Sequence, residues 1–366
     1  MENGCNRWFT AEEARRTNFI NDFSAVCFMS VRDVARLHSD IGQTKPVALV
    51  QSAVGGTRVS AWMSSDAIAK AAIKAGMKPG PGANSNNRVS VLYNAMISPF
   101  NKMSIRAAMW YQGEANAETS YPVSKTLYYA SYLEAMIESW RTLKGDNFDF
   151  FIVTLPPSVF EGTPDQMGTG RMEVRIAELE VANTLTNNSA APVCTELGGS
   201  SKWGIDHPFN KVEISRRLAL QIVHETYDSQ GRVDAVENGT LLYSSLWTGP
   251  ILSDVTANEG NVTISFEEFS SAKLTMHDVK GLNSDGTRDD CTLCCEKQPP
   301  FEVSSDGTNW TRIDRSDVVL GLSSVTLQGT KSVTKIRYGW MDAPECVLMN
   351  EDLLPLAPFV YSINQL

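Results

Sequence analysis

The sequence predicts an α/β fold in which a mainly parallel sheet carries helices on both faces and a β-rich region follows it. Two observations support this prediction. Up to about Asp228, short apolar runs alternate with longer stretches of helical periodicity, which is typical of βαβ units. From about Val233 onward, short runs of alternating polarity stand between Gly-Asn and Asp-Gly turn signals. The 366 residues are enough for two domains, which we expect at residues 1–230 and 231–366.

The first half supplies its strands and helices in alternation. Buried strands are expected at the apolar runs 46–50, 105–111, 148–155 and 191–197. Helical periodicity predicts helices at 24–40, 65–75, 126–143, 171–183 and 210–227. No run of four apolar residues precedes the first helix. The strand that usually opens such a sheet is therefore missing from the pattern.

The second half reads as antiparallel strands of a sandwich-like region. Alternating polarity predicts strands at 261–266, 324–327 and 333–338.

The composition of the whole chain excludes several classes of protein. A hydrophobic content of 42% excludes intrinsic disorder, and a net charge of −10 argues against a nucleic-acid surface. No apolar stretch approaches 18 residues, so we expect no membrane span, and Met1 to Asn21 contain no apolar core of a signal peptide.

The seven cysteines and four glycosylation sequons indicate export. Cys291, Cys294 and Cys295 lie close together, but only Cys346 follows them and no histidine follows His277. This pattern favours disulfides of an oxidising compartment over zinc, so we expect no metal site and at least one unpaired thiol. The sequons begin at Asn187, Asn238, Asn261 and Asn309 and predict a glycoprotein.

Glycines and polar residues follow two of the expected strands. The candidates are Gly55, Gly56, Gln112, Gly113 and Glu114. The pair of glycines comes after the run 46–50, and the other three come after the run 105–111. An open α/β sheet binds its ligand at the carboxyl ends of its strands, where glycine lets backbone amides approach the ligand. His207, at the head of the helix expected from 210, completes a site at the same edge.

These segments resemble the sialate O-acetylesterases of the SGNH (GDSL-like) hydrolase superfamily. The resemblance runs from about Phe23 to the C-terminus, and its most specific block is Trp-Tyr-Gln-Gly-Glu at 110–114. The other blocks are Val-Ala-Leu-Val-Gln-Ser-Ala-Val-Gly-Gly-Thr-Arg-Val-Ser-Ala-Trp at 47–62, Ser-Val-Leu-Tyr-Asn-Ala-Met-Ile-Ser-Pro at 90–99, Asp-His-Pro at 206–208, Lys-Ile-Arg-Tyr-Gly-Trp at 335–340 and Leu-Pro-Leu-Ala-Pro-Phe at 354–359.

The resemblance implies a three-layer SGNH-like sheet and ester hydrolysis by a Ser nucleophile and a His general base, without a cofactor. His207 matches the base. An amide of Gly55 or Gly56 matches an oxyanion donor, and Gln112 with Gly113 matches the block that faces the oxyanion. The implied substrate is an O-acetylated sialic acid or a related acetylated sugar, and the implied location is secreted or lysosomal.

Two departures from the family pattern concern the nucleophile and the acid. The family's Gly-Gln-Ser-Asn is absent, Thr44 in Gly-Gln-Thr-Lys precedes the run 46–50, and Ser52 matches a different block. The acid expected three residues before His207 is Gly204. The adjacent Asp206 is the first candidate to orient the imidazole, although neighbouring side chains diverge, and Glu196 or a backbone carbonyl are alternatives.

The sequence leaves three interpretations open. The first is a sialate O-acetylesterase that lacks its N-terminal part with the nucleophile and is nearly inactive as written. The second is a non-catalytic product of the same family that begins at Met1 and binds a carbohydrate or a partner. The third is an acetylesterase for another acetylated sugar, such as acetylxylan. An upstream in-frame segment with a signal peptide and Gly-Gln-Ser-Asn would favour the first.

Overall fold

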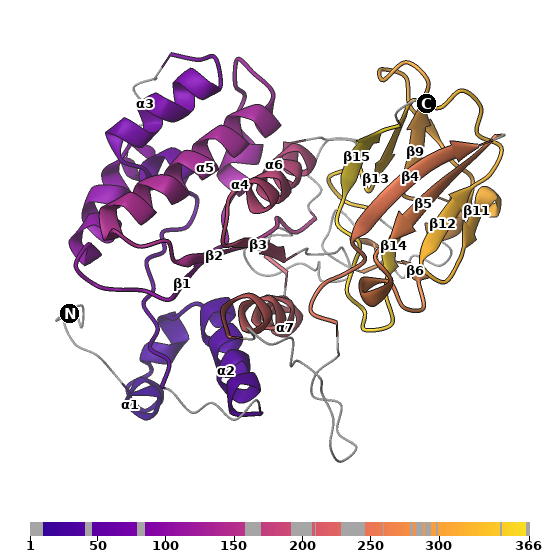
Figure 1. The fold of residues 1–366 in the computed structure, drawn as a ribbon. Helices are drawn as coiled ribbons and strands as arrows, with labels where there is room; N and C mark the ends of the chain where they lie inside the picture. The colour runs from indigo at the N-terminus through magenta and orange to yellow at the C-terminus, as the bar shows by residue number, and fades with distance from the viewer. Residues whose placement is uncertain are drawn as a thin grey trace.

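The computed structural model describes residues 10–40, 46–78, 85–157, 170–191, 207–208, 210–227, 246–258, 260–278, 281–282, 288–289, 294–297, 299–344 and 346–363. Figure 1 shows a half built of helices around a small sheet beside a half built of strands. The helices are α1 (Ala11–Arg16), α2 (Ala25–Asp40), α3 (Ser65–Lys74), α4 (Glu114–Ala117), α5 (Lys125–Lys144), α6 (Gly170–Thr184), α7 (Lys211–Ile222) and α8 (Cys294–Lys297). The strands of the first half are β1 (Ala107–Trp110), β2 (Asp149–Val153) and β3 (Asn188–Ala191).

The small sheet is parallel and has the order β1-β2-β3. All five residues of the central strand β2 are buried, as expected for a strand covered on both faces. Phe150 and Ile152 enter the core beneath α3, α5 and α6. Phe151 and Val153 enter a second core with α2 and α7. Figure 1 shows these two groups of helices on opposite sides of the sheet. The expectation of a parallel sheet with helices on both faces is confirmed.

The five helices predicted from periodicity are present as α2, α3, α5, α6 and α7, each with ends within two residues of the prediction apart from the last. The stretch expected to end the last helix, Val223–Tyr227, continues α7 as a π-helix. Side-chain caps set several of the starts: Ser124 accepts a hydrogen bond from Leu127 N before α5, and Asn210 accepts one from Glu213 N before α7. Among the described helices, none has the length and apolarity of a membrane span.

The prediction of a buried strand at 46–50 is wrong. The segment bonds to no strand among the described residues, and four of its five residues are exposed. Its apolar composition matched a strand, but a strand also needs a backbone partner, and no described segment pairs with this one. The strand expected at 191–197 begins earlier, at Asn188, and the part beyond Ala191 lies outside the described residues.

The second half is an antiparallel sandwich. The strands are β4 (Leu252–Asn258), β5 (Asn261–Phe266), β6 (Thr275–Asp278), β7 (Gly281–Leu282), β8 (Arg288–Asp289), β9 (Phe301–Ser304), β10 (Thr311–Arg312), β11 (Val318–Leu320), β12 (Ser324–Leu327), β13 (Lys335–Tyr338), β14 (Cys346–Met349) and β15 (Phe359–Ser362). One four-stranded sheet has the order β11-β12-β5-β4 and the other has the order β10-β9-β13-β15. Inward side chains such as Val262, Val325 and Ile336 share one core. The predicted β-rich region is confirmed, whereas its boundary near residue 230 falls outside the described residues.

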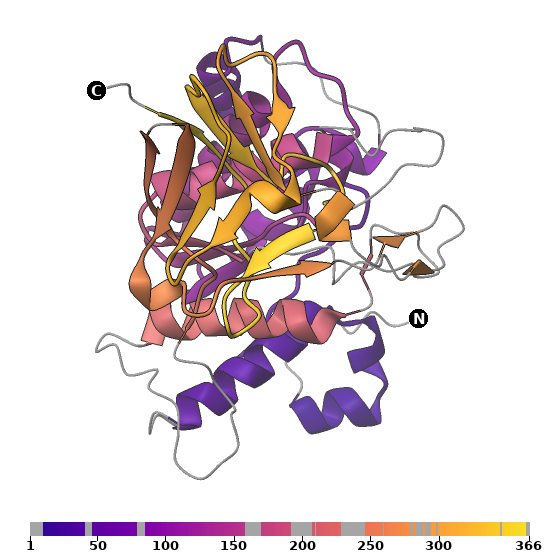
Figure 2. The ribbon, with the colours of Figure 1, turned by 90° about the vertical axis from the view of Figure 1, so that its right-hand side faces the viewer.

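The two halves meet along α6 and α7. Arg175 on α6 donates to Leu155 O (2.7 Å) and Pro156 O (2.9 Å) after β2, and also to Met341 O (3.0 Å) and Asp342 O (2.6 Å) after β13. Asp342 Oδ1 in turn accepts from Met172 N at 2.9 Å. In Figure 2 the sandwich faces the viewer with the α/β half behind it. A buried guanidinium therefore links the end of β2 to the sandwich.

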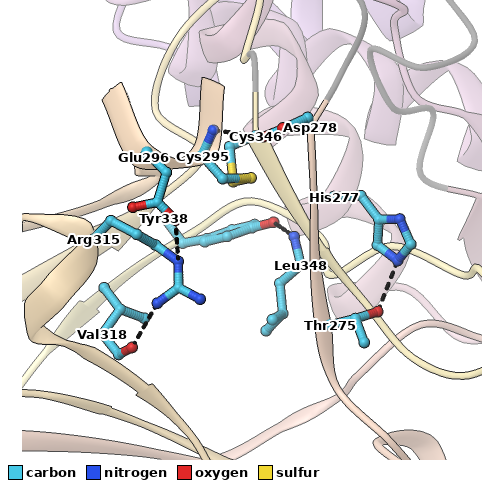
Figure 3. Close-up of a disulfide and its surroundings, with 10 residues drawn as sticks. All are labelled: Thr275, His277, Asp278, Cys295, Glu296, Arg315, Val318, Tyr338, Cys346 and Leu348. Atoms are coloured by element: carbon cyan, nitrogen blue, oxygen red, sulfur yellow. Dashed lines mark hydrogen bonds and ion pairs between the residues drawn. A yellow bond between two sulfur atoms is a disulfide. The ribbon is translucent and has the colours of Figure 1, made fainter. Parts of the chain in front are cut away.

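A disulfide joins Cys295 on α8 to Cys346 on β14, with Cα atoms 4.8 Å apart (Figure 3). Cys295 N also donates to Asp278 Oδ1 at 2.7 Å, which fixes α8 against the end of β6. Cys27 is a free thiol in the described residues, and burial raises its pKa to about 11. Burial therefore keeps this thiol protonated and unreactive at neutral pH. The described residues contain no cluster of three or more His, Cys, Asp or Glu suited to a metal ion.

Candidate active site

The two glycines predicted to bind an oxyanion form an exposed turn. Gly56 has φ +69, a backbone conformation that favours glycine, and no atom lies within 4 Å of the Cβ that either glycine lacks. The N–H groups of Gly55 and Gly56 donate to no partner among the described residues. Asn87 Nδ2 holds the turn by donating to Gly56 O at 3.0 Å. The turn therefore presents two unengaged amides on a tethered backbone.

The side chain of Gln112 ties this turn to the end of β1. Its Nε2 donates to Thr57 O at 2.8 Å and to Asn116 Oδ1 at 2.9 Å, and its Oε1 accepts from the Tyr129 hydroxyl at 2.9 Å. A primary amide has two N–H donors, and here both are engaged. The geometry makes Gln112 a residue that positions the glycine turn. Donation to an oxyanion would require one of these two hydrogen bonds to break.

Two residues that the sequence analysis did not select complete this network. Asn116 is 1% exposed, accepts from Val59 N at 3.0 Å and donates to the Tyr121 hydroxyl at 2.9 Å. Tyr129 on α5 is fully buried, and its hydroxyl also lies 2.9 Å from Gln112 O, so the two oxygens share one donor. The only available signal for Asn116 was its place two residues after the specific block at 110–114. Nothing local marks Tyr129, because its partner lies 17 positions away in the chain.

Position 113 requires glycine for two reasons, its backbone conformation and the lack of space for a side chain. Its φ is +150, and a Cβ at this position would lie 2.8 Å from Val174 Cγ1 and 3.1 Å from Leu155 Cδ1. Side chains of α6 and of the end of β2 thus close over the backbone that leads into α4. Any larger residue at position 113 must push Val174 away, which would move the turn that carries Gln112 and Glu114.

The hydroxyls nearest to the glycine turn in the chain are already hydrogen-bonded to carbonyls. Ser52 Oγ donates to Met96 O at 3.0 Å. The buried Thr57 Oγ1 donates to Val54 O at 2.7 Å and accepts from Trp62 Nε1 at 3.0 Å. Neither hydroxyl is placed as an activated nucleophile, which would donate to a general base. Thr44, the other hydroxyl that the sequence analysis considered, lies outside the described residues.

His207 is exposed and precedes α7, whose N-cap is Asn210, so it lies before the helix instead of on its first turn. The first residue of α7, Lys211, lies with its Nζ 5.2 Å from the centroid of the Tyr111 ring, next to Gln112. Burial lowers the pKa of Lys211, and the charge of Glu114 partly opposes this shift. The start of α7 therefore lies beside the end of β1. The convergence of His207 with Gly56 stays a prediction, and Asp206 and Glu196 lie outside the described residues.

A buried carboxyl group lies behind the site. Glu178 on α6 is fully buried, and its Oε2 accepts from Leu155 N at 3.0 Å, while Oε1 has no hydrogen-bond partner among the described residues. Burial raises the pKa of Glu178 well above its usual value, and the nearby negative charge of Glu114 adds to this effect. Burial and the charge of Glu178 likewise raise the pKa of Tyr129. Burial therefore favours the neutral form of both groups, which act as hydrogen-bonding supports.

Comparison with known proteins places this arrangement in a family. The family model described as carbohydrate esterase, sialic acid-specific acetylesterase, matches residues 8–189, which contain the glycine turn and the Gln112 network. The chain belongs to the sialic acid-specific acetylesterase family. It is similar to the sialate O-acetylesterases of Pongo abelii and Homo sapiens, each 25% identical over 360 residues, and to that of Mus musculus, 24% identical over 368 residues.

These matches cover most of this chain but a smaller share of each relative. The alignments with the Pongo abelii and Homo sapiens proteins cover 93% of this chain but 61% of those relatives. A crystal structure of a carbohydrate acetylesterase from Xanthomonas citri has a similar fold, with a TM-score of 0.68 and 22% identity. That match covers 93% of this chain and 66% of the other. This sialic acid-specific acetylesterase family member therefore shares its fold, including the β-rich half, with a solved carbohydrate acetylesterase.

Proposed function

We propose that this chain forms the site of a sialate O-acetylesterase, which removes O-acetyl groups from sialic acids. Membership in a family of carbohydrate esterases supports ester hydrolysis, and similarity to the mammalian sialate O-acetylesterases supports this substrate. The observation that carries the proposal is the pair of unengaged amides at Gly55 and Gly56, which Gln112 holds beside the end of β1. Fixed N–H donors of this kind stabilise the oxyanion of acyl transfer.

In the proposed reaction, the serine of a Gly-Gln-Ser-Asn segment, which Met1–Leu366 does not contain, is the nucleophile. Its hydroxyl attacks the acetyl carbonyl carbon while His207 takes the hydroxyl proton. The carbonyl oxygen becomes an oxyanion that accepts from the glycine amides. The imidazolium then gives its proton to the departing sugar hydroxyl, and water releases acetate from the serine. Asp206, Glu196 or a backbone carbonyl would orient His207, as the sequence analysis proposed, and Glu114 would contact the substrate.

We propose further that Met1–Leu366 alone is nearly inactive. The sequence has no Gly-Gln-Ser-Asn, and the hydroxyls of Ser52 and Thr57 donate to backbone carbonyls. Without a nucleophile, an enzyme of this type retains only the effect of its oxyanion site and of binding, roughly 10³- to 10⁴-fold over water.

The test is an esterase assay of the purified chain with 4-nitrophenyl acetate and with an O-acetylated sialic acid. We expect turnover close to this residual level, and restored turnover in a longer chain that carries Gly-Gln-Ser-Asn upstream. In the longer chain, His207→Ala should remove activity. Full activity of Met1–Leu366 that disappears in His207→Ala would contradict the missing nucleophile, and Ser52 and Thr44 would be the first residues to mutate. A longer chain with no activity would contradict the esterase proposal itself.

A non-catalytic carbohydrate-binding role is the second candidate function. It is supported by the same engaged hydroxyls, since a site without a nucleophile can still bind a sugar. Binding of a sialic acid by the chain, combined with no turnover in any longer product, would favour this candidate. Hydrolysis of acetylxylan in preference to O-acetylated sialic acid would instead favour an acetylesterase for another sugar.

We also propose a secreted or lysosomal location. The Cys295–Cys346 disulfide supports this proposal, because disulfides persist in oxidising compartments. The exposed sequon residues Asn187, Asn261 and Asn309 are accessible to a glycan. Treatment of the protein from its native source with a peptide N-glycosidase should reduce its apparent mass. An unchanged mass together with reduced cysteines would contradict the proposal.

A further inference from the structure

Arg58, the second residue after the glycine turn, carries a positive charge with no counter-ion in the described structure. Its backbone N donates to Asn87 Oδ1 at 2.6 Å, so the same asparagine holds both Gly56 and Arg58. The side chain is half-buried, and its Nε is buried without a hydrogen-bond partner. No ion pair or hydrogen bond of its guanidinium with a described residue is found. A buried donor of this kind is costly unless something else satisfies it.

Two tyrosines lie within electrostatic range of Arg58. Its charge lowers the pKa of Tyr121 and Tyr128, against the larger raising effect of burial on both phenols. Tyr121, Tyr128 and Tyr132 stack in a row, with ring centroids 3.6 Å and 4.1 Å apart. Asn116 connects this row to the site, because it donates to the Tyr121 hydroxyl and accepts from Gln112. Arg58 therefore adjoins the same network that fixes the glycine turn.

We propose that Arg58 binds the carboxylate of an acidic sugar and so selects sialic acid over neutral acetylated sugars. This inference rests on the proposed function, because it takes the amides of Gly55 and Gly56 as the place of the ester carbonyl. The Cα atoms of Gly56 and Arg58 are at most about 7 Å apart along the chain. A single monosaccharide can thus extend from the glycine turn to the guanidinium, which pairs with a carboxylate through two parallel hydrogen bonds.

A neutral sugar would leave the charge of Arg58 uncompensated. A carboxylate at the terminal nitrogens of the guanidinium would compensate this charge in a partly buried setting, where charge-assisted hydrogen bonds are stronger than in water. Arg58 thereby separates two substrates that the fold alone does not separate, O-acetylated sialic acid and acetylxylan.

The experiment measures binding, so it needs no turnover. The full chain is titrated with N-acetylneuraminic acid and with its methyl ester, which has the same shape without the charge. We expect the acid to bind about 10- to 100-fold more tightly than the ester, and Arg58→Gln to lose that difference by weakening the acid alone. Arg88→Gln is the matched control, because Arg88 is an exposed arginine of the neighbouring segment and should leave both affinities unchanged.

Equal binding of acid and ester by the unmodified chain overturns the inference without any variant, and so does unchanged affinity of Arg58→Gln for the acid. Failure of both probes to bind also overturns it. Arg58-dependent binding of the acid, with no hydrolysis by a longer chain that carries a nucleophile, would keep this inference and refute the esterase. Hydrolysis of acetylated sugars with no dependence on Arg58 would keep the esterase and refute the role of Arg58.

Discussion

In the sandwich, each strand of the two four-stranded sheets pairs with a neighbour and sends alternate side chains into one core. In the α/β half, β2 is buried on both faces, but β1 is bonded to β2 alone among the described strands and three of its four residues are half-exposed. The apolar segment 46–50 stays unpaired in the same half. Residues that favour strands are thus paired in the sandwich, whereas some of them are left unpaired in the α/β half.

The difference teaches that an apolar run forms a strand only where a backbone partner is available. Val262 in β5 lies in a run of alternating polarity and is 0% exposed, whereas Val50 lies in a continuous apolar run and is 40% exposed. The α/β half depends instead on its helices and on contacts with the sandwich, among them those of the Arg175 guanidinium.

The largest effect is expected at Arg175. Replacing it with Met leaves four buried carbonyls without a donor, at Leu155, Pro156, Met341 and Asp342. Arg175→Met should lower the free energy of unfolding by about 4 kcal/mol and split one transition into two. Urea unfolding followed by fluorescence measures this loss, and Arg36→Met, at an exposed residue of α2, is the control. A single transition at the original midpoint would contradict the linking role.

The next effect concerns the disulfide of the sandwich. Removing it as Cys295→Ser with Cys346→Ser frees a loop of 51 residues and should destabilise the sandwich by about 3 kcal/mol. Cys27→Ser in the α/β half is the matched control, since Cys27 forms no disulfide. Calorimetry should show an unfolding midpoint below those of the unmodified chain and of Cys27→Ser. A midpoint equal to that of the unmodified chain would contradict the stabilising role of the disulfide.

Helices and alternating strands were predictable because their patterns are local. The 3.6-residue period located α5 and α7, and strict alternation located β5 and β12 at their observed bounds. The strand β3 was placed too late, because Asn188 and Ser189 do not look like strand residues. The helix α1 was missed, although Thr10 and Glu13 form the capping box that marks its start.

The site was predictable only in part for the same reason. Gly55, Gly56 and Gln112 stood out because glycines and amides after an apolar run are a local signal. The contacts that decide their roles are not local: Gln112 reaches Thr57 across 55 positions, and Asn116 reaches Val59 across 57. The sequence therefore indicated where the site lies. It did not indicate that both amide hydrogens of Gln112 are hydrogen-bonded to Thr57 O and Asn116 Oδ1.

The contrast between the two valines can be measured directly. Val262→Ala removes two buried methyl groups from the sandwich core and should cost about 2 kcal/mol. Val50→Ala removes the same atoms from an exposed position and should change stability by less than about 0.5 kcal/mol. Chemical denaturation of both variants compares them. Losses of similar size would show that the segment 46–50 is packed in solution.

The smallest effect is a change in how steeply the free energy of unfolding varies with pH. It arises from Glu178, in the α/β half alone. The pKa of Glu178 is raised in the folded state by burial, so the folded protein keeps a proton that the unfolded chain releases. The contribution of this group to stability is fully present below the usual carboxyl pKa. It is lost as pH rises from there through the raised folded pKa. Glu178→Gln cannot ionise and should flatten this decline, while Glu138→Gln, at an exposed residue of α5, should keep it. Unfolding free energies between pH 5 and 8 decide the matter, and parallel curves for the unmodified chain and Glu178→Gln would mean that Glu178 is charged in the folded protein.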